Sequence, residues 1–194
     1  MRQHLLLLCA AVLLAAGCAD ARPPLRTVAH VDLQRYAGTW YVIANIPYWL
    51  EDGKVATADR YGLRPDGLLD NTYVFRRGDF TAPEEEWHGR AWVVNEQTNA
   101  EWNVRFVWPF SVTYLVIDLD PEYRWAAVGH PSRDYFWVLS RERSLPPATY
   151  QAILARAAAQ GYDISRVALV PQPAAQTSAS ATVSATVSAT TATP

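Results

Sequence analysis

Apolar and polar side chains alternate along several short segments between Gly38 and Arg141. The clearest is 101–108, where one face carries the large apolar residues Trp102, Val104, Phe106 and Trp108. The same period of two occurs in 40–46 and 69–76. Because successive side chains of a strand point to opposite faces, each segment is predicted to be a strand with one face against a core.

Turn sequences separate these segments at intervals of roughly 10–15 residues. They include Asp52-Gly53, Pro65-Asp66-Gly67, Arg77-Gly78-Asp79, Trp108-Pro109-Phe110 and Pro131-Ser132-Arg133. Connections this short leave no room for the helical crossovers of a parallel sheet, so the strands are predicted to be antiparallel. The segment 135–139 is apolar on both faces, so we expect it to be covered on the outside as well.

One helix is predicted after the strands, and it can supply that cover. An apolar stripe recurs there at helical spacing: Tyr150, Ile153, Leu154 and Ala157. Pro146 and Pro147 suit its first turn, Ser144 is a candidate cap, and Gly161 suits its end. A short last strand is expected near Ile164–Val170. The predicted fold is all-β: an eight-stranded antiparallel up-and-down barrel with one C-terminal flanking α-helix, able to hold one small ligand.

The two ends of the chain differ from this domain. Residues 1–17 read as an export signal, with Arg2 followed by an apolar run too short to span a bilayer. Small residues precede Cys18, which resembles the site where bacterial lipoproteins are lipidated; an ordinary secretory signal cleaved near Ala16–Gly17 is the alternative. We expect a lipidated tether at 18–27, a barrel domain at 28–173 and a disordered Ala/Ser/Thr-rich tail at 174–194.

Composition narrows the functional classes. The chain has eight Trp and a net charge of −2, which suits aromatic strand walls and argues against a nucleic-acid partner. Its two cysteines, Cys9 and Cys18, both precede the predicted domain, so no disulfide and no thiol catalysis are expected inside the barrel. The histidines His30, His88 and His130 have no metal-ligand spacing, so no metal and no other cofactor is expected.

The sequence 130–134 contains the residue types of a hydrolase triad in His130, Ser132 and Asp134. All three fall in one predicted turn, and the chain has no Gly-x-Ser-x-Gly elbow. We therefore interpret these residues as turn chemistry and predict that the protein is not an enzyme.

Three segments together resemble the lipocalin family. Gly38-Thr39-Trp40 is similar to its Gly-x-Trp signature, 118–123 to its turn between the sixth and seventh strands, and Arg141 to the arginine that packs on the Trp. The resemblance covers Asp32 to Pro173 and favours the bacterial outer-membrane lipoprotein branch, related to apolipoprotein D. It implies that Gly38, Trp40 and Arg141 close one end of the barrel. Asp59, in Ala58-Asp59-Arg60-Tyr61, departs from that branch and makes the pocket more polar if it points inward.

The resemblance also implies a function: a membrane-anchored lipocalin that carries or stores a fatty acid or lysophospholipid during cell-envelope maintenance. Cys18 would attach it to the outer membrane, facing the periplasm. The candidate pocket wall is Tyr73, Phe75, Trp102, Val104, Phe106, Tyr114 and Val116. Lys54 and Arg105 are candidate head-group cations, and 48–50 is expected to lie in a loop at the mouth. A lipocalin-fold enzyme on a lipophilic substrate and a structural lipoprotein with a filled barrel remain alternatives, and homodimerisation stays open.

Overall fold

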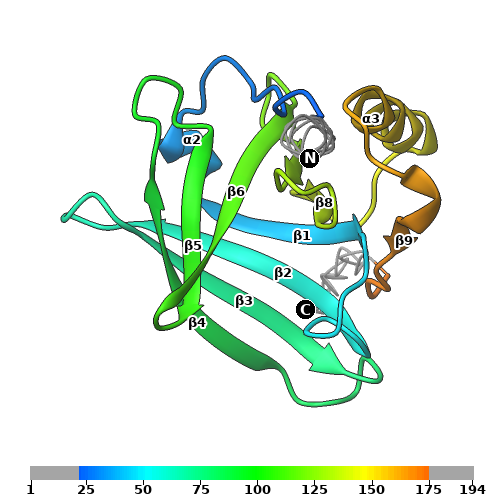
Figure 1. Cartoon of the computed structure of the whole chain (residues 1–194). Coiled ribbons are helices and arrows are strands. Elements are labelled where there is room, and N and C mark those ends of the chain that lie inside the picture. The colour runs from blue at the N-terminus through cyan, green and yellow to red at the C-terminus, as the bar shows by residue number, and fades with distance from the viewer. Residues whose placement is uncertain (1–21, 175–194) are drawn as a thin grey trace, which may run out of the picture.

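Eight antiparallel strands close into a barrel in the computed structural model, which describes residues 22–174 (Figure 1). The predicted signal peptide, Cys18 and the predicted tail beyond Ala174 lie outside the described residues. Each strand pairs with the next in sequence, and β1 pairs with both β2 and β8, so the sheet closes on itself. The predicted eight-stranded barrel is confirmed. Its strands are β1 (Gly38–Asn45), β2 (Lys54–Leu63), β3 (Leu69–Arg77), β4 (Glu85–Val93), β5 (Glu101–Val107), β6 (Phe110–Leu119), β7 (Trp125–Gly129) and β8 (Phe136–Ser140).

The end of the barrel at which β1 begins, the closed end, is filled by side chains. A short helix, α2 (Leu33–Tyr36), lies across it, and the Asp32 carboxylate caps this helix by accepting from the backbone N–H of Gln34 and Arg35. Trp40 is fully buried there and its Nε1 donates to the Tyr36 carbonyl at 2.7 Å. The core above it is made mainly of Val31, Val42, Leu69, Trp102, Val116, Val128 and Leu139.

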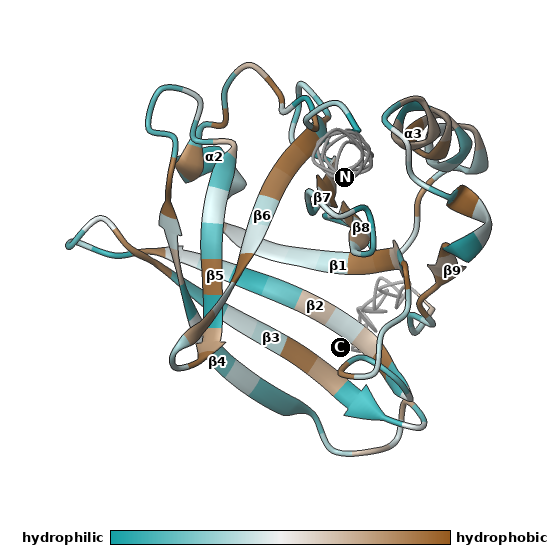
Figure 2. Ribbon diagram, in the orientation of Figure 1, coloured by the Kyte–Doolittle hydropathy of each residue, from teal (hydrophilic) through white to brown (hydrophobic). Residues whose placement is uncertain are grey.

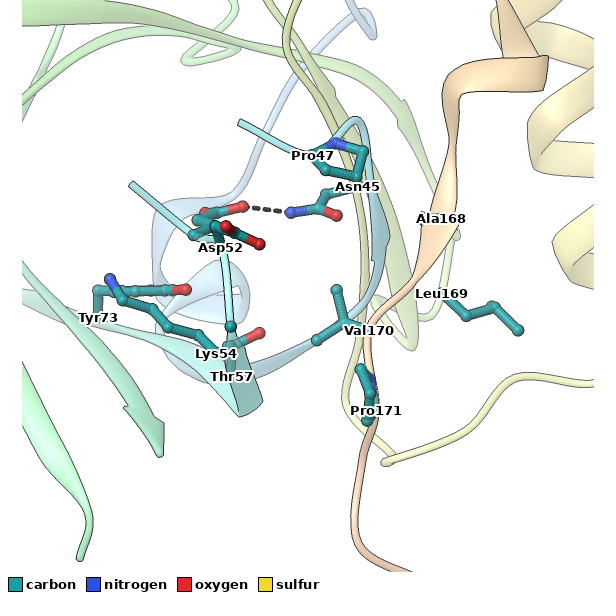
Figure 3. A pocket seen from close by; sticks show the side chains of 12 residues that line it. Asn45, Pro47, Asp52, Lys54, Thr57, Tyr73, Ala168, Leu169, Val170 and Pro171 are labelled. Carbon is teal, nitrogen blue, oxygen red and sulfur yellow. Dashed lines mark hydrogen bonds between the residues drawn. The ribbon is translucent and has the colours of Figure 1, made fainter. Parts of the chain in front are cut away.

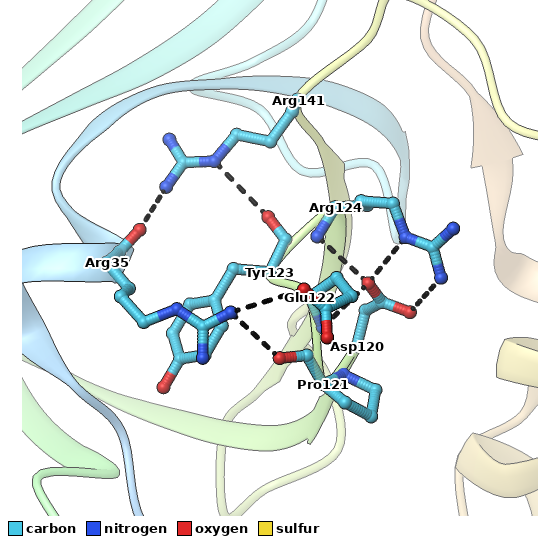
Figure 4. A network of polar contacts seen from close by, with 7 residues as sticks. All are labelled: Arg35, Asp120, Pro121, Glu122, Tyr123, Arg124 and Arg141. Carbon is cyan, nitrogen blue, oxygen red and sulfur yellow. Dashed lines mark hydrogen bonds and ion pairs between the residues drawn. The ribbon is translucent and has the colours of Figure 1, made fainter.

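Arg141 joins several segments at the closed end. Its guanidinium lies 3.8 Å from the Trp40 ring centre and donates to the Thr39 carbonyl at 2.8 Å. It also donates to the carbonyl of Arg35 at 2.7 Å (Figure 4). A further bond reaches the carbonyl of Ala37 at 3.0 Å, at the end of α2. Gly38 has φ +96°, and a Cβ there would lie 3.3 Å from Arg141 Nη1. The structure thus places Gly38, Trp40 and Arg141 together, with the arginine tying the strand ends to α2.

The turn between β6 and β7 is fixed by the buried side chain of Asp120 (Figure 4). Its carboxylate accepts from the backbone N–H of Glu122 (3.1 Å) and Arg124 (3.2 Å), and it pairs with the Arg124 guanidinium at 2.8 Å. The Arg124 guanidinium, more than the backbone contacts, holds the pKa of Asp120 below its usual value. This is the predicted turn between the sixth and seventh strands.

The C-terminal helix α3 (Pro147–Ala159) covers the outside of the barrel. Its apolar side chains Ile153, Leu154 and Ala157 are buried in one cluster with Phe136 and Val138 of β8. The expected outer cover of 135–139 is therefore confirmed, and brown apolar bands mark β8 in Figure 2. The expected Ser144 cap is wrong, because Pro146 occupies the N-cap and no side chain bonds there. No helix within residues 22–174 is long and apolar enough to cross a bilayer.

The C-terminal segment 168–172 fills a gap in the barrel wall. β1 and β2 pair only from Gly38–Tyr61 to Tyr41–Ala58. Beyond that point β9 (Ala168–Leu169) pairs with the end of β1, and Gln172 Nε2 donates to the Val42 carbonyl (2.9 Å) and the Thr57 carbonyl (2.8 Å). Figure 3 shows this segment passing beside the gap. The expected last strand is shorter than 164–170, because Ile164–Arg166 forms a 3-10 turn, η1.

Gln172→Ala is expected to lower the free energy of unfolding by about 1–3 kcal/mol, since it leaves two strand carbonyls without their donor. Urea titration followed by tryptophan fluorescence measures the change. Gln151→Ala, on the exposed side of α3, is the matched control and should have little effect. Equal stability of the two variants would mean that backbone pairing alone holds the gap closed.

Candidate ligand-binding cavity

A cavity of about 1080 Å³ occupies the half of the barrel above the closed-end core. This volume lies just above the range of about 300–1,000 Å³ that is usual for small-molecule sites. Aromatic and aliphatic side chains dominate its wall: Tyr48, Trp49, Leu50, Tyr61, Tyr73, Trp87, Val104, Phe106, Val107, Phe110, Val112, Tyr114, Tyr135, Trp137 and Leu139. The barrel is therefore filled at its closed end and hollow above it.

The structure divides the predicted pocket wall into two groups. Tyr73, Val104, Phe106 and Tyr114 line the cavity, although Phe106 is 39% exposed at its rim. Three others do not line it: Trp102 and Val116 belong to the closed-end core, and Phe75 lies beneath Lys54. Strand alternation fixes the face of a side chain but not its height along the barrel axis.

The mouth of the cavity carries exposed apolar residues. In the β5–β6 hairpin, three large apolar side chains are exposed: Val107 (66%), Trp108 (79%) and Phe110 (75%). In the β1–β2 loop, Trp49 is 81% exposed, whereas Tyr48 packs edge-on against Tyr135 with ring centres 5.3 Å apart. The loop at 48–50 thus folds partly onto its own barrel and partly projects from it.

Two residues that line the cavity, Glu51 and Trp87, were not predicted as lining. The Glu51 carboxylate accepts from Trp137 Nε1 (3.2 Å), Tyr48 OH (3.4 Å) and Asn45 Nδ2, and burial raises its pKa. No sequence pattern indicates that Glu51 lines the cavity, because it lies in the loop between β1 and β2. Alternation could have identified Trp87, because it lies on the same inward face of β4 as Gly89 and Ala91.

The two candidate head-group cations lie outside the cavity. Lys54 Nζ sits 3.4 Å from the Trp87 ring centre and 3.9 Å from that of Phe75, and burial lowers its pKa to about 8. It lines a separate space of about 150 Å³ beside the C-terminal segment (Figure 3). Arg105 lies over Trp92 at 5.2 Å and does not line the cavity.

Asp59 points into the cavity. It lies in β2 opposite Trp40 of β1 and Tyr73 of β3. Burial, and secondarily the negative charge of Glu51, raises the pKa of its carboxyl from 3.8 to about 8. Asp59, which departs from the pattern of the bacterial branch, therefore makes this side of the lumen polar.

The residues of the triad type do not assemble as a triad. Ser132 Oγ lies 2.9 Å from His130 Nδ1, but that nitrogen also accepts the Ser132 backbone N–H at 3.2 Å, a local turn contact. The Asp134 carboxylate pairs instead with Arg166 at 3.3 Å. Within residues 22–174, no three His, Cys, Asp or Glu side chains converge as a metal site would require. The site is a lined cavity, which is suited to enclosing a molecule.

Comparison with known proteins agrees with this geometry. The family model described as "Lipocalin-like domain" matches residues 31–172. Outer membrane lipoprotein Blc of Escherichia coli (strain K12) is 37% identical over 168 residues, covering 84% of this chain and 93% of that protein. The protein of the same name in Vibrio cholerae is 30% identical, over 89% of this chain and 99% of its own length.

One more distant relative by sequence and one solved structure agree with the family match. Apolipoprotein D of Macaca fascicularis is 29% identical, over 77% of this chain and 80% of its own length. The structure of insecticyanin from the tobacco hornworm superposes with a TM-score of 0.63 at 18% identity, over 79% of this chain and 87% of that one. The family match, the relatives and the half-hollow barrel together show that this chain belongs to the lipocalin family.

Proposed function

We propose that the protein carries a single-chain lipid, of the size of a fatty acid or a lysophospholipid, inside its barrel at the outer membrane. The observation that supports this most directly is the cavity of about 1080 Å³ with its predominantly aromatic and aliphatic wall. A long alkyl chain that buries about 400 Å² gains about 10 kcal/mol at 25 cal/mol per Å², before the costs of association. The cargo is held without a covalent bond.

The exposed apolar hairpin offers a route into the cavity. Val107 and Phe110 line the cavity and are also exposed, so they form a continuous apolar surface from the outside to the lumen. A chain that leaves a bilayer beside this hairpin stays in contact with apolar side chains. A tether at Cys18 would hold the mouth near such a bilayer, in agreement with relatives named outer membrane lipoproteins.

Val104→Trp tests the lumen as the lipid site. The added indole occupies space in the cavity wall, so we expect the affinity for a single-chain lipid to fall about ten-fold or more, which equals about 1.4 kcal/mol. Native mass spectrometry of the purified protein measures the lipid retained, and calorimetry measures the affinity. Val94→Trp places the same side chain at an exposed position after β4 and should retain the cargo. Equal retention by both variants would place the lipid outside the barrel.

Cys18→Ser tests the anchor. Without its acyl chains, each contributing about 0.8 kcal/mol per buried CH₂, the protein should move from the membrane fraction to the supernatant. Fractionation followed by immunoblotting measures this distribution. Cys9→Ser, within the predicted export signal, should leave it unchanged. Membrane retention of the Cys18 variant would show that another part of the protein attaches it.

A further inference from the structure

The charged side chains that line the cavity are all acidic. They are Glu51, Asp59 and Glu86, and within the described residues no lysine or arginine joins them. Glu86 pairs with Arg60 at 2.7 Å, and Glu51 accepts several hydrogen bonds. Asp59 has neither an ion pair nor a hydrogen bond within residues 22–174. One carboxyl group in the cavity wall is therefore left without a partner.

The residues around Asp59 form a patch of hydrogen-bond acceptors and aromatic faces. In the β2–β3 pairing, Asp59 lies opposite Tyr73 and Tyr61 lies opposite Asn71. Because residues two apart in a strand share a face, all four side chains point into the lumen. Asn71 is buried, and its Oδ1 has no hydrogen-bond partner within the described residues. Tyr114 completes the patch, since its hydroxyl accepts from that of Tyr61 at 3.1 Å.

We propose that this patch, with Asp59 at its centre, binds the protonated amine of an amphiphilic ligand. The inference rests on the proposed carriage of a single-chain molecule in the lumen and specifies its head group. A buried carboxylate gains most from a cation at contact distance, and tyrosine rings attract the same cation through their faces. Lys54 shows the second interaction in this barrel, since its ammonium already lies against the rings of Tyr73, Phe75 and Trp87.

The position of the patch fixes the orientation of the ligand. Asp59 lies opposite Trp40 of the closed end, whereas Val107 and Phe110 lie at the mouth. The amine would therefore enter first, and the alkyl chain would extend along Phe106 and Val112 toward the hairpin. A fatty carboxylate in the same orientation would meet the carboxyl groups of Asp59 and Glu51, which offer it no positive charge to pair with.

An amine would also change the protonation of Asp59. The charged group that acts on this carboxyl is Glu51, and the neutral hydroxyls that lie near enough for Asp59 to raise their pKa are those of Tyr36, Tyr48, Tyr61, Tyr73 and Tyr114. None of these is a cation. An ammonium ion at contact distance favours the ionised carboxylate, so binding near neutral pH should release a proton.

Three ten-carbon probes test this on the purified full-length protein: decylamine, decan-1-ol and decanoate. Calorimetry at pH 7 should give decylamine an affinity about ten-fold or more above that of decanoate, with decan-1-ol between them. Repeating the decylamine titration in buffers of different ionisation enthalpy should reveal the released proton. This comparison needs no variant, so it does not depend on the folding of one.

Asp59→Asn then tests whether the preference for decylamine depends on Asp59. The variant should bind decylamine and decan-1-ol with similar affinity, whereas Asp70→Asn, the same change on the outside of β3, should keep the preference of the unchanged protein. Tightest binding of decanoate, or a decylamine preference that survives in Asp59→Asn, would overturn the amine site and leave lipid carriage standing. If decan-1-ol and both charged probes all fail to bind, the proposed function falls and the amine site falls with it.

Discussion

Arg141→Lys is expected to lower the free energy of unfolding by about 2–4 kcal/mol. The guanidinium lies 3.8 Å from the Trp40 ring centre and donates to four carbonyls of the α2–β1 junction, those of Arg35, Tyr36, Ala37 and Thr39. A lysine ammonium is a compact donor that cannot reach all these carbonyls and stack on the ring together. The acceptors that lose their donor each cost about 1–3 kcal/mol where water cannot replace it. Urea denaturation of the purified protein, followed by tryptophan fluorescence, gives the difference.

Arg105→Lys is the matched control for this change. Arg105 also lies over an indole, that of Trp92, but at 5.2 Å and outside the cavity. Exposed cation–π pairs are worth about 0.5–1 kcal/mol, and lysine retains part of that. Comparable losses in the two variants would mean that stacking alone explains the effect and that the carbonyl contacts of Arg141 contribute little.

The closed end of the barrel could be predicted because its signals are local. Alternation with a period of two places Trp40 and Val42 on one face of β1, and short turns fix the antiparallel order. The apolar stripe of the C-terminal helix and the two apolar faces of 135–139 complement each other, so their packing followed from pattern alone. The predicted Ser144 cap was wrong, because Pro146 is the N-cap of the helix and no side chain bonds there.

The residues that line the cavity could be predicted only in part, because the positions of several depend on contacts between distant segments. Alternation gave the correct face for Trp102 and Val116 but could not show that both lie in the closed-end core. Glu51 is held by Trp137, 86 positions away in sequence, and no local pattern encodes that contact. Similarly, Gln172 bridges β1 and β2 from the end of the domain.

Asp59→Asn should stabilise the ligand-free protein by several kcal/mol at pH 8 and change it little near pH 4. Burial raises the folded-state pKa of Asp59 to about 8, against about 3.9 in an unfolded chain. Between these values the folded state binds the proton and the unfolded state does not. The stability that Asp59 contributes is therefore fully present below pH 4 and is lost as the pH rises to 8, at about 1.4 kcal/mol per pH unit. Asparagine does not ionise, so the variant avoids this loss.

The decisive quantity is the stability difference between variant and parent as a function of pH, measured by urea titration at pH 5, 6.5 and 8 after bound lipid is removed. Taking the difference cancels the pH dependence that other titratable groups contribute to stability. Lys54 is one of them, since its lowered pKa makes the fold more stable as the pH rises from about 8 toward 10.5. Asp70→Asn, whose carboxyl pairs with Arg64 on the outside, should show no such rise. A difference that stays flat for Asp59→Asn would mean that the carboxylate is ionised in the folded lumen, with water or an ion solvating it. A difference that rises when the lumen is empty and flattens when decylamine fills it would show that the ammonium ion offsets the cost of ionising Asp59.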